Sequence, residues 1–405
     1  MVPKGWIKAP VQDFGHVSAG RQRSPNFTKG TLRPYLRVAN VFENYIDTTD
    51  VNEMMFTESE YQRYKLDIGD ILLNEGQSTE LVGRPAMYVG YPENCCFQNT
   101  LVRFKADHDK VDASYALQRF LLCLYDGTFQ AISKKTTSIA HLGVSRFAEL
   151  NLLWPPLVEQ QKITQILSTW DKAISTTEKL LENSQQQKKA LMQQLLTGKK
   201  RLLDETGLKF NIPWGKYRLG ALLKEEKQRN KDNSLSRVLS VTNHSGFVLP
   251  ENQFSKRIAS DEVSNYKVVI KDQFGYNPSR INVGSFARLD QFENGLLSPM
   301  YVVFSIKSEN LDSDFFLYWM KSNEAKQRIN NSTQGSVRDS VGFDAISSFV
   351  LKLPEIQEQR KIAKVLSFAD QEIETLQKKL DCLKQEKKAL MQQLLTGKKR
   401  VKVAV

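Results

Sequence analysis

The stretch "KKALMQQLLTGKKR" (residues 188–201) occurs a second time, letter for letter, at residues 387–400. The repeat extends upstream of it, because residues 155–201 align with residues 354–400 without a gap and about 27 of the 47 positions are identical. Chance does not produce agreement over such a length. The sequence therefore predicts a chain made of two copies of one structural unit.

The segments that precede these near-identical stretches share a pattern rather than a sequence. "HLG" at residue 141 aligns with "SVG" at residue 340, and "LVRF" at residue 101 aligns with "YVVF" at residue 301 after a small slip in the offset. One part of each unit is thus constant, and the other part differs between the copies. We expect the constant part to do one job twice and the other part to do a different job in each copy.

Each near-identical segment is typical of one long helix. Its apolar positions alternate at spacings of four and three residues, which is the seam of a coiled coil. In the first copy the seam contains Ile163, Leu167, Trp170, Ile174, Thr177, Leu181, Ser184, Lys188, Leu191 and Leu195. In the second copy it contains Ile362, Leu366, Ala369, Ile373, Leu376, Leu380, Leu383, Lys387, Leu390 and Leu394. About 40 residues at 1.5 Å each give a rod of roughly 60 Å.

The predicted helix ends carry suitable residues. Pro155, Pro156 and Pro354 suit a helix start, whereas Gly198 and Gly397 suit the position just past a helix end. The apolar face of such a long helix must be buried against another element, and we expect that element to be the helix of the other copy. Paired within one chain, the rods must run antiparallel. The alternative is two ordinary core helices in separate domains, against which their length argues.

The expected fold class is α+β. Two globular domains, each a mixture of helices and strands, are expected to be separated by a long antiparallel two-helix coiled-coil spacer and related by a pseudo-two-fold axis. Short β-rich runs such as "DILLN" at residue 70 and "MYVVFSI" at residue 300 alternate with helical runs such as "SYALQRFLLCLY" and "DFFLYWMKSNEAKQRI". We expect four segments: a first globular domain (1–154), a central spacer helix (155–201), a second globular domain (202–353), and a C-terminal spacer helix with a basic tail (354–405).

Composition favours a nucleic acid as partner. The formal net charge of +12 lowers the cost of approaching a polyanion, although an acidic protein or an anionic membrane surface stays open as an alternative. No apolar run is long enough to span a bilayer, and no secretory signal is evident, so a cytoplasmic location is expected. The four cysteines include no C-x-x-C pair, so reduced thiols are expected.

Catalytic motifs are missing from the sequence. There is no G-x-x-x-x-G-K-[ST] phosphate loop, no H-E-x-x-H, and no N-P-P-[YF] of adenine methylases. His16, His108, His141 and His244 lie far apart in sequence and are expected to be packing or surface residues. We therefore expect a binding protein that has no catalytic residues, no metal site and no cofactor of its own.

Several loop-like stretches combine cations for phosphates with polar side chains for base edges. The strongest pair is "SKKTTS" (133–138) and "STQGSVR" (332–338), which occupy equivalent places in the two copies but differ in wording. "GRQRSPNFTKGTLRP" (20–34), "NEGQSTELVGR" (74–84) and "NPSRINVGSFAR" (277–288) are further candidates, although plain surface solvation explains any one loop equally well. The candidate DNA-binding residues are Arg21, Arg23, Lys29, Arg33, Gln77, Ser78, Arg84, Lys134, Lys135, Thr136, Thr137, Asn277, Ser279, Arg280, Arg288, Gln334, Ser336 and Arg338.

These features together resemble the specificity subunit of type I restriction-modification enzymes. The resemblance rests on "P-x-L-x-E-Q-x-K-I" at residue 155 and "P-x-I-x-E-Q-x-K-I" at residue 354, each leading into a helix closed by "LLTGKKR". "PYLRVANV" at residue 34, "GDILLN" at residue 69 and "LSPMYVVF" at residue 297 are also similar to phrases of that family's target-recognition domains. The resemblance covers nearly the whole chain.

The resemblance implies two target-recognition domains that read a split double-stranded DNA sequence with an unread gap. Two modification subunits would dock on the helical spacer and bring S-adenosylmethionine, and restriction subunits with motor and nuclease activity, dependent on ATP and Mg²⁺, would join them. A bivalent coiled-coil scaffold that joins two protein partners is the leading alternative. An enzyme with a disguised site is a weaker one, because no metal or cofactor constellation is evident.

Overall fold

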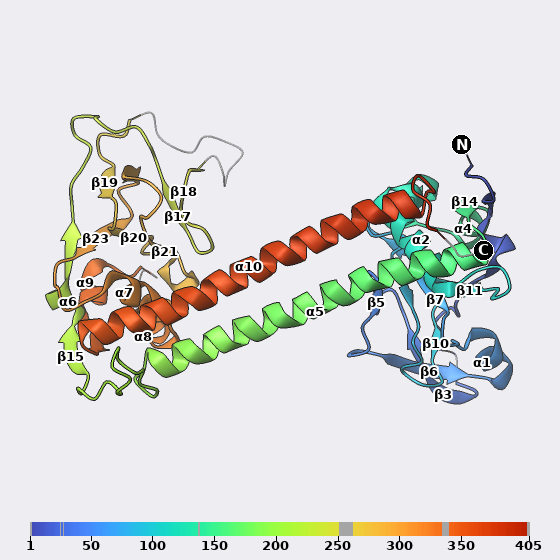
Figure 1. Ribbon diagram of the computed structural model, residues 1–405, viewed down its shortest axis with the longest axis horizontal. Helices are drawn as coiled ribbons and strands as arrows, with labels where there is room; N and C mark the ends of the chain where they lie inside the picture. The colour runs from blue at the N-terminus through green and yellow to red at the C-terminus, as the bar shows by residue number, and fades with distance from the viewer. Residues whose placement is uncertain are drawn as a thin grey trace. The chain divides into compact units, whose positions relative to one another are not determined.

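The computed structural model describes residues 2–24, 26, 28–136, 138–250, 262–333 and 340–402. It divides into two compact units. The first unit contains Met1–Glu178 and Lys378–Val405, and the second contains Lys179–Gln377. Each unit mixes helices and strands, which confirms the predicted mixture within a two-copy chain (Figure 1).

The first unit holds short strands in several small sheets. Its four-stranded antiparallel sheet has the order β2-β11-β7-β9, and a three-stranded sheet has the order β10-β3-β6. The strands are β1 (Ile7–Pro10), β2 (Gly15–Ala19), β3 (Thr31–Leu36), β4 (Val41–Phe42), β5 (Tyr45–Ile46), β6 (Asn52–Phe56), β7 (Ile71–Asn74), β8 (Gly76–Gln77), β9 (Pro85–Met87), β10 (Cys96–Phe97), β11 (Leu101–Ala106), β12 (Lys134–Lys135), β13 (Ala140–His141) and β14 (Asn151–Trp154). The helices wholly within this unit are η1 (Val11–Asp13), α1 (Glu58–Tyr64), α2 (Ala113–Tyr125), α3 (Thr128–Ile132) and α4 (Val144–Ala148).

The second unit repeats this framework. Its four-stranded sheet has the order β16-β23-β20-β21, and the β15–β24 pair corresponds to the β1–β14 pair of the first unit. The strands are β15 (Gly215–Arg218), β16 (Leu223–Glu226), β17 (Ser240–Thr242), β18 (Gly246–Val248), β19 (Lys267–Ile270), β20 (Phe274–Tyr276), β21 (Phe286–Arg288), β22 (Asn294–Leu297), β23 (Val302–Ile306) and β24 (Val350–Leu353). The helices are α6 (Leu219–Leu222), η3 (Ile281–Val283), α7 (Ser313–Met320), α8 (Asn323–Thr333) and α9 (Phe343–Ser348).

One helical run of the sequence is interrupted in the structure. "DFFLYWMKSNEAKQRI" forms two helices, α7 and α8, with a break at Lys321 and Ser322. Ser322 explains the break, because its hydroxyl accepts a hydrogen bond from the backbone N–H of Ala325 at 3.3 Å and so caps the start of α8. In the first unit the corresponding helix α2 runs unbroken to Tyr125.

Two long helices are shared by the units. Helix α5 covers Leu157–Leu195 and α10 covers Ile356–Leu394, and both are drawn without interruption in Figure 1. Helix α5 starts directly after Pro156 and α10 starts two residues after Pro354. Each ends before a glycine with positive φ, Gly198 at +70° and Gly397 at +71°. Only a residue without Cβ adopts this conformation cheaply. The predicted helix starts and stops are confirmed.

Every residue of the two predicted seams is buried or half-buried. Within the first unit, Asp171 of α5 pairs with Lys387 of α10 at 2.6 Å, and Glu178 pairs with Lys384 at 2.8 Å. Residue numbers rise along α5 while the partner numbers fall along α10, so the helices run antiparallel there. Whether they supercoil as a coiled coil stays a prediction, as do the four segment boundaries.

Each unit therefore takes the start of one long helix and the end of the other. Ile163 and Leu167 of α5 share the first unit's core with Leu394 and Leu395. The second unit's core likewise combines Leu195 and Leu196 with apolar residues near the start of α10. Neither copy of the repeat completes a core by itself.

The "E-Q" of each repeat has a specific structural task. Glu159 is 2% exposed and Glu358 is 0% exposed. Arg400 donates two hydrogen bonds to Glu159, both at 2.7 Å, and Arg201 donates two to Glu358, both at 2.7 Å. We call these contacts the Arg–Glu clasps. The arginine that closes one copy's "GKKR" thus binds the glutamate that opens the other copy's helix.

The neighbouring glutamines connect each long helix to its own copy. Gln160 accepts a hydrogen bond from the backbone N–H of Asp112, which caps the start of α2. Gln359 accepts one from the backbone N–H of Asp312, which caps the start of α7, and both distances are 2.9 Å. The residues that are identical in the two repeats therefore make two equivalent sets of contacts.

We expect Arg400→Ala to destabilise the protein by about 1–3 kcal/mol, because among the described residues only the Trp6 indole N–H then donates to the buried carboxylate of Glu159. Urea unfolding followed by circular dichroism measures the change. Lys399→Ala, an exposed change in the same "GKKR", is the control and should stay within about 0.5 kcal/mol of the wild type. Equal stability of the two variants would show that the clasp does not hold the unit together.

Candidate nucleic-acid interface

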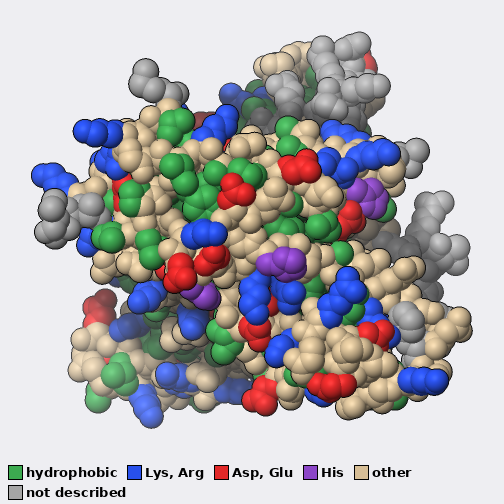
Figure 2. All heavy atoms as spheres, turned by 90° about the vertical axis from the view of Figure 1, so that its right-hand side faces the viewer, with side chains coloured by type: hydrophobic (Ala, Val, Ile, Leu, Met, Phe, Trp, Pro, Cys, Tyr) green, Lys and Arg blue, Asp and Glu red, His purple; other side chains and the backbone are tan. Residues whose placement is uncertain are grey.

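The charge of the molecule does not by itself locate an interface. On the face drawn in Figure 2, Lys and Arg side chains are scattered among Asp and Glu instead of forming one continuous basic area. Among the described residues, no cluster of three or more His, Cys, Asp or Glu could hold a metal ion. Over the same residues, no helix is both long and apolar enough to cross a membrane. The site must therefore be built from individual loops.

In the first unit, two predicted loops meet on one small sheet with the order β12-β13-β8. Lys134 lies opposite His141, and Lys135 lies opposite Ala140, which in turn lies opposite Gln77. Strands β12 and β13 form a hairpin whose turn is closed by Thr136, because its backbone N–H and its hydroxyl both donate to the carbonyl oxygen of Ile139 at 2.9 Å. Pairing of the strands thus brings "SKKTTS" beside "NEGQSTELVGR".

The exposed side of this sheet is polar. Lys134, Lys135 and Thr136 are exposed, and Gln77 and Ser78 are half-buried. Gln77 accepts a hydrogen bond from the backbone N–H of Ser78 at 3.1 Å. Cations at a hairpin beside an amide and a hydroxyl supply phosphate contacts and hydrogen-bonding groups for bases.

Three further side chains lie at this sheet, and nothing in the sequence singles them out as candidate binding residues. The Nδ1 atom of His141 lies 3.0 Å from a carboxylate oxygen of Glu75, and Arg146 donates to the carbonyl oxygen of His141 at 2.8 Å. The sequence alone favours a packing or surface role for His141. The pairing of β13 with β8 brings Glu75 beside it, and a single sequence carries no signal for that pairing. Arg146 lies on the following helix α4, five residues along the chain.

In the second unit, the turn at Asn277 is the equivalent feature. Asn277 accepts a hydrogen bond from the backbone N–H of Ser279 at 3.0 Å, which fixes the turn and leaves Ser279 and Arg280 exposed. The backbone N–H of Val341 donates to the carbonyl oxygen of Pro278 at 3.0 Å. The turn therefore adjoins Val341, which lies three residues past the end of the second predicted reading loop.

Four predicted residues lie outside the described residues, namely Thr137, Gln334, Ser336 and Arg338. Arg23 and Lys29 of the N-terminal loop are exposed. They lie near the start of the three-stranded sheet that contains β3, and the structure does not join them to the β12-β13-β8 sheet. Their contribution to binding stays a prediction.

Four of the predicted arginines are engaged within their own unit. Arg21 is buried, forms an ion pair with Glu60 at 2.7 Å and lies over the Phe56 ring. The guanidinium of Arg33 lies 3.6 Å from the centre of the Tyr61 ring. These contacts hold the β3–β6 sheet against α1. The stretch "GRQRSPNFTKGTLRP" therefore exposes less positive charge than its sequence suggests.

Arg84 supports a hairpin. It donates to the carbonyl oxygen of Val41 at 3.0 Å and lies over the Phe42 ring, and desolvation lowers its pKa. Asn74 also donates to Val41, at 3.2 Å. Val41 and Phe42 form strand β4, so these side chains fix one side of the β4–β5 hairpin.

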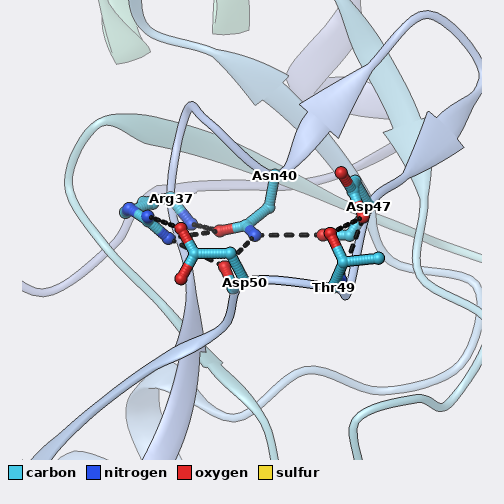
Figure 3. A network of polar contacts seen from close by, with 5 residues as sticks. All are labelled: Arg37, Asn40, Asp47, Thr49 and Asp50. Carbon is cyan, nitrogen blue, oxygen red and sulfur yellow. Dashed lines mark hydrogen bonds and ion pairs between the residues drawn. The ribbon is translucent and has the colours of Figure 1, made fainter.

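The other side of this hairpin is held by the polar network shown in Figure 3. Asn40 donates to the carbonyl oxygens of Asp47 and Asp50 at 3.0 and 2.8 Å, and it accepts a hydrogen bond from Arg37 at 3.2 Å. Arg37 also forms an ion pair with Asp50 at 2.7 Å, and Thr49 donates its hydroxyl hydrogen to Asp47. The network makes the loop between β3 and β6 a defined structure.

Arg288 is the fourth engaged arginine. It contacts the carboxylates of Asp290 at 2.6 Å and Asp314 at 2.7 Å, and it donates to the Ser313 hydroxyl at 2.8 Å. Burial works against its charge, but the two carboxylates outweigh this and raise its pKa. Arg288 therefore connects β21 to the start of α7.

Two units on one framework define an α+β protein of internal repeats. A family model described as the type I restriction modification DNA specificity domain matches residues 3–184 and 266–385. The chain belongs to this family of type I restriction-modification specificity subunits, whose role is DNA recognition.

Relatives agree with this assignment. A putative type I restriction enzyme MjaX specificity subunit of Methanocaldococcus jannaschii is 27% identical over 414 residues, covering 99% of this chain and 95% of the relative. The type I restriction enzyme StySPI specificity subunit of Salmonella potsdam is 21% identical over 395 residues, covering 91% and 84%.

Solved structures share the fold. The S subunit of a type I restriction-modification system from M. genitalium has a TM-score of 0.54 at 14% identity, covering 96% of both chains. A chain from a structure on complex assembly and conformational transition of the type I R-M system has a TM-score of 0.58 at 12% identity, covering 98% of both. At these identities the likeness establishes the fold alone.

We predict that two arginines close in sequence affect different properties, one DNA binding and the other stability. Arg280→Ala removes an exposed cation and should weaken binding of target DNA by about 1–3 kcal/mol while unfolding stays within about 0.5 kcal/mol. Arg288→Ala should instead lower the free energy of unfolding by about 1 kcal/mol, because two carboxylates and a hydroxyl lose their partner. Fluorescence anisotropy and urea unfolding measure the two quantities. Unchanged DNA affinity of the Arg280 variant would remove the Asn277 turn from the interface.

Proposed function

We propose that this chain is the non-catalytic specificity subunit of a type I restriction-modification complex and reads a two-part DNA target, one half-site with each unit. The observation that carries the proposal is the contrast between framework and loops. The sheets β2-β11-β7-β9 and β16-β23-β20-β21 have the same order, whereas the polar segments at equivalent places, residues 133–138 and 332–338, differ in sequence. A common scaffold with different reading loops suits two different half-sites.

The loop 133–138, with the Lys134–Lys135 hairpin, would contact the first half-site, and residues 332–338 with the Asn277 turn would contact the second. Lysines supply phosphate contacts that fix the register, whereas Arg, Gln, Asn, Ser and Thr supply hydrogen bonds to base edges. Arg21, Arg33, Arg84 and Arg288 would act indirectly, by holding the elements that carry these loops.

Helices α5 and α10 would form the spacer on which two modification subunits dock. The equivalent Arg–Glu clasps support this, because two identical partners need two equivalent surfaces. The partners would bring S-adenosylmethionine and the methylation chemistry, and restriction subunits would add ATP- and Mg²⁺-dependent cleavage.

Selection from a random duplex pool by the full chain with its modification subunits tests the proposal. The expected product is a bipartite motif with an unselected gap, methylated only when the modification subunits and S-adenosylmethionine are present. The chain alone, given S-adenosylmethionine, ATP and Mg²⁺, should leave plasmid DNA unchanged. Recovery of random sequences would instead favour the bivalent scaffold that joins two protein partners.

The spacer also predicts how the gap responds to helix length. Because α5 and α10 run antiparallel within the first unit, an insertion must be made in both helices, after Lys179 and after Lys378, rather than near the helix end at Leu195. Four residues in each add roughly 6 Å and a turn of about 40°. DNA advances about 3.4 Å and about 35° per base pair, so a gap longer by one base pair is expected, with two as the limit.

Methylation-site mapping of the insertion variant with its modification subunits measures the gap. Substituting four alanines for four exposed residues at the same places, without insertion, is the control. An unchanged gap, or a change in the bases of either half-site, would show that the helices do not set the spacing.

A further inference from the structure

A groove of about 540 Å³ in the second unit lies between the last turns of α5 and the junction of α7 with α8. Its ionisable lining is five lysines and one carboxylate: Lys188, Lys189, Lys199, Lys321, Lys326 and Glu324. We call it the lysine groove. None of these lysines was among the residues that the sequence suggested for DNA binding.

Carboxylates of the described residues neutralise only part of the positive charge of the lysine groove. Lys188 pairs with Asp370, and Glu324 pairs with Arg328 at 2.8 Å. For the other lysines, Lys189, Lys199, Lys321 and Lys326, no ion pair with a carboxylate occurs in the described part of the chain. Like charges at close quarters repel one another, and a bound anion would relieve this cost.

Lys321 shows the effect of this crowding. Desolvation lowers the pKa of its ammonium group, and the charge of Lys188 lowers it further. Asp370 and Asp290 act in the opposite direction, and Arg288 adds to the lowering. These groups lie on α5, on α10, on β21 and just after β21. Together with desolvation they leave a net cost to the charge of Lys321, which an anion in the groove would offset.

The backbone adds a second feature that favours an anion. The chain breaks at Lys321 and Ser322, so the first turn of the 11-residue helix α8 lines the groove. The first turn of a helix carries backbone N–H groups without intrahelical acceptors and the positive end of the helix dipole. Glu324 lies in this turn, but its carboxylate is engaged by Arg328.

The first unit provides an internal comparison. Its corresponding groove, of about 620 Å³, is lined by Lys387 and Lys388, the equivalents of Lys188 and Lys189. Three lysines there face three carboxylates, Glu43, Asp171 and Glu178. Ion pairs of Lys387 with Asp171 and of Lys384 with Glu178 balance the charge. The divergent part of the repeat contributes to this difference, because it supplies Lys321 and Lys326 to one groove and Glu43 to the other. The long helices also contribute, because Glu178 has Gln377 as its equivalent in the second copy.

We propose that the lysine groove binds the phosphate backbone of DNA beside the second half-site. The proposal rests on the proposed function and adds a phosphate-binding site to it. Helix α8 leads from the groove to Ser332 and Thr333, where the predicted reading segment 332–338 begins. Eleven residues of helix span roughly 16 Å, which is about five base pairs. One rigid helix would thus fix the distance between a backbone contact and the bases read.

An acidic segment of a partner protein fits this groove less well. Two identical partners need equivalent surfaces in both units, whereas the two grooves differ in charge by the lysines and carboxylates named above. Lysines and a helix start bind phosphates without reading bases, and one-sided placement agrees with a role in positioning one half-site.

The test compares two double variants of the full chain. Lys189→Gln with Lys326→Gln removes two exposed lysines from the lysine groove, and Lys384→Gln with Lys388→Gln removes two exposed lysines from the balanced groove. Glutamine keeps helix propensity, so both variants are expected to fold, and urea unfolding checks this. Binding of a labelled target duplex and of a scrambled duplex is measured between about 50 and 200 mM salt.

The salt slope is the change in the logarithm of the DNA association constant with the logarithm of the salt concentration. For the lysine-groove variant its magnitude should be smaller by about 2, so the affinity of this variant falls roughly tenfold less than that of the wild type across this range. Both duplexes should be weakened by the same factor at low salt, and the control variant should keep the wild-type slope. An unchanged slope, or weaker assembly with the modification subunits and normal DNA binding, would overturn the proposal. A wild-type chain that prefers no sequence would contradict the proposed function, while the slopes would still decide whether the groove binds phosphates.

Discussion

The Arg–Glu clasps are the contacts on which the architecture depends. A carboxylate as buried as Glu159 or Glu358 is stable only when a cation or several donors accompany it, and here the cation comes from the far end of the other copy. The chain therefore needs the sequence "GKKR" at the end of both repeats and the sequence "E-Q" near the start of both. Duplication with near identity is a requirement of two equivalent joints, whereas the sheets beside them are free to diverge.

Divergence beside constant joints also separates the chemistry of the two units. The long helices present Lys188 and Lys387 at equivalent places, yet the first meets the break between α7 and α8, and the second meets the β4–β5 hairpin with Glu43. The surroundings of an unchanged residue thus differ between the copies. A pseudo-symmetric subunit of this kind can offer the same surface to two partners while presenting a different surface to each half of its target.

Helix periodicity and the terminal prolines and glycines made the long helices predictable, because these signals are local. The β-rich runs at Ile71 and Val302 were likewise found as β7 and β23. The site was harder to predict, since an arginine in a polar stretch gives no sign of a partner elsewhere in the chain. Arg21 binds Glu60 and Arg288 binds Asp314, so two apparent surface cations are internal supports. The break at Ser322 also escaped prediction, because its neighbours keep a helical spacing.

The shared cores have a consequence for synthesis of the chain. The second unit is continuous in sequence, but the first needs Met391, Leu394 and Leu395 from the last turns of α10. Domains usually fold in the order in which they leave the ribosome. Here the first unit needs residues of α10 that are made after the whole second unit, so it becomes complete later than the second unit. Until then its apolar core is open to solvent, so a chain interrupted between Gln377 and Met391 is left with a folded second unit and an unfinished, aggregation-prone first one.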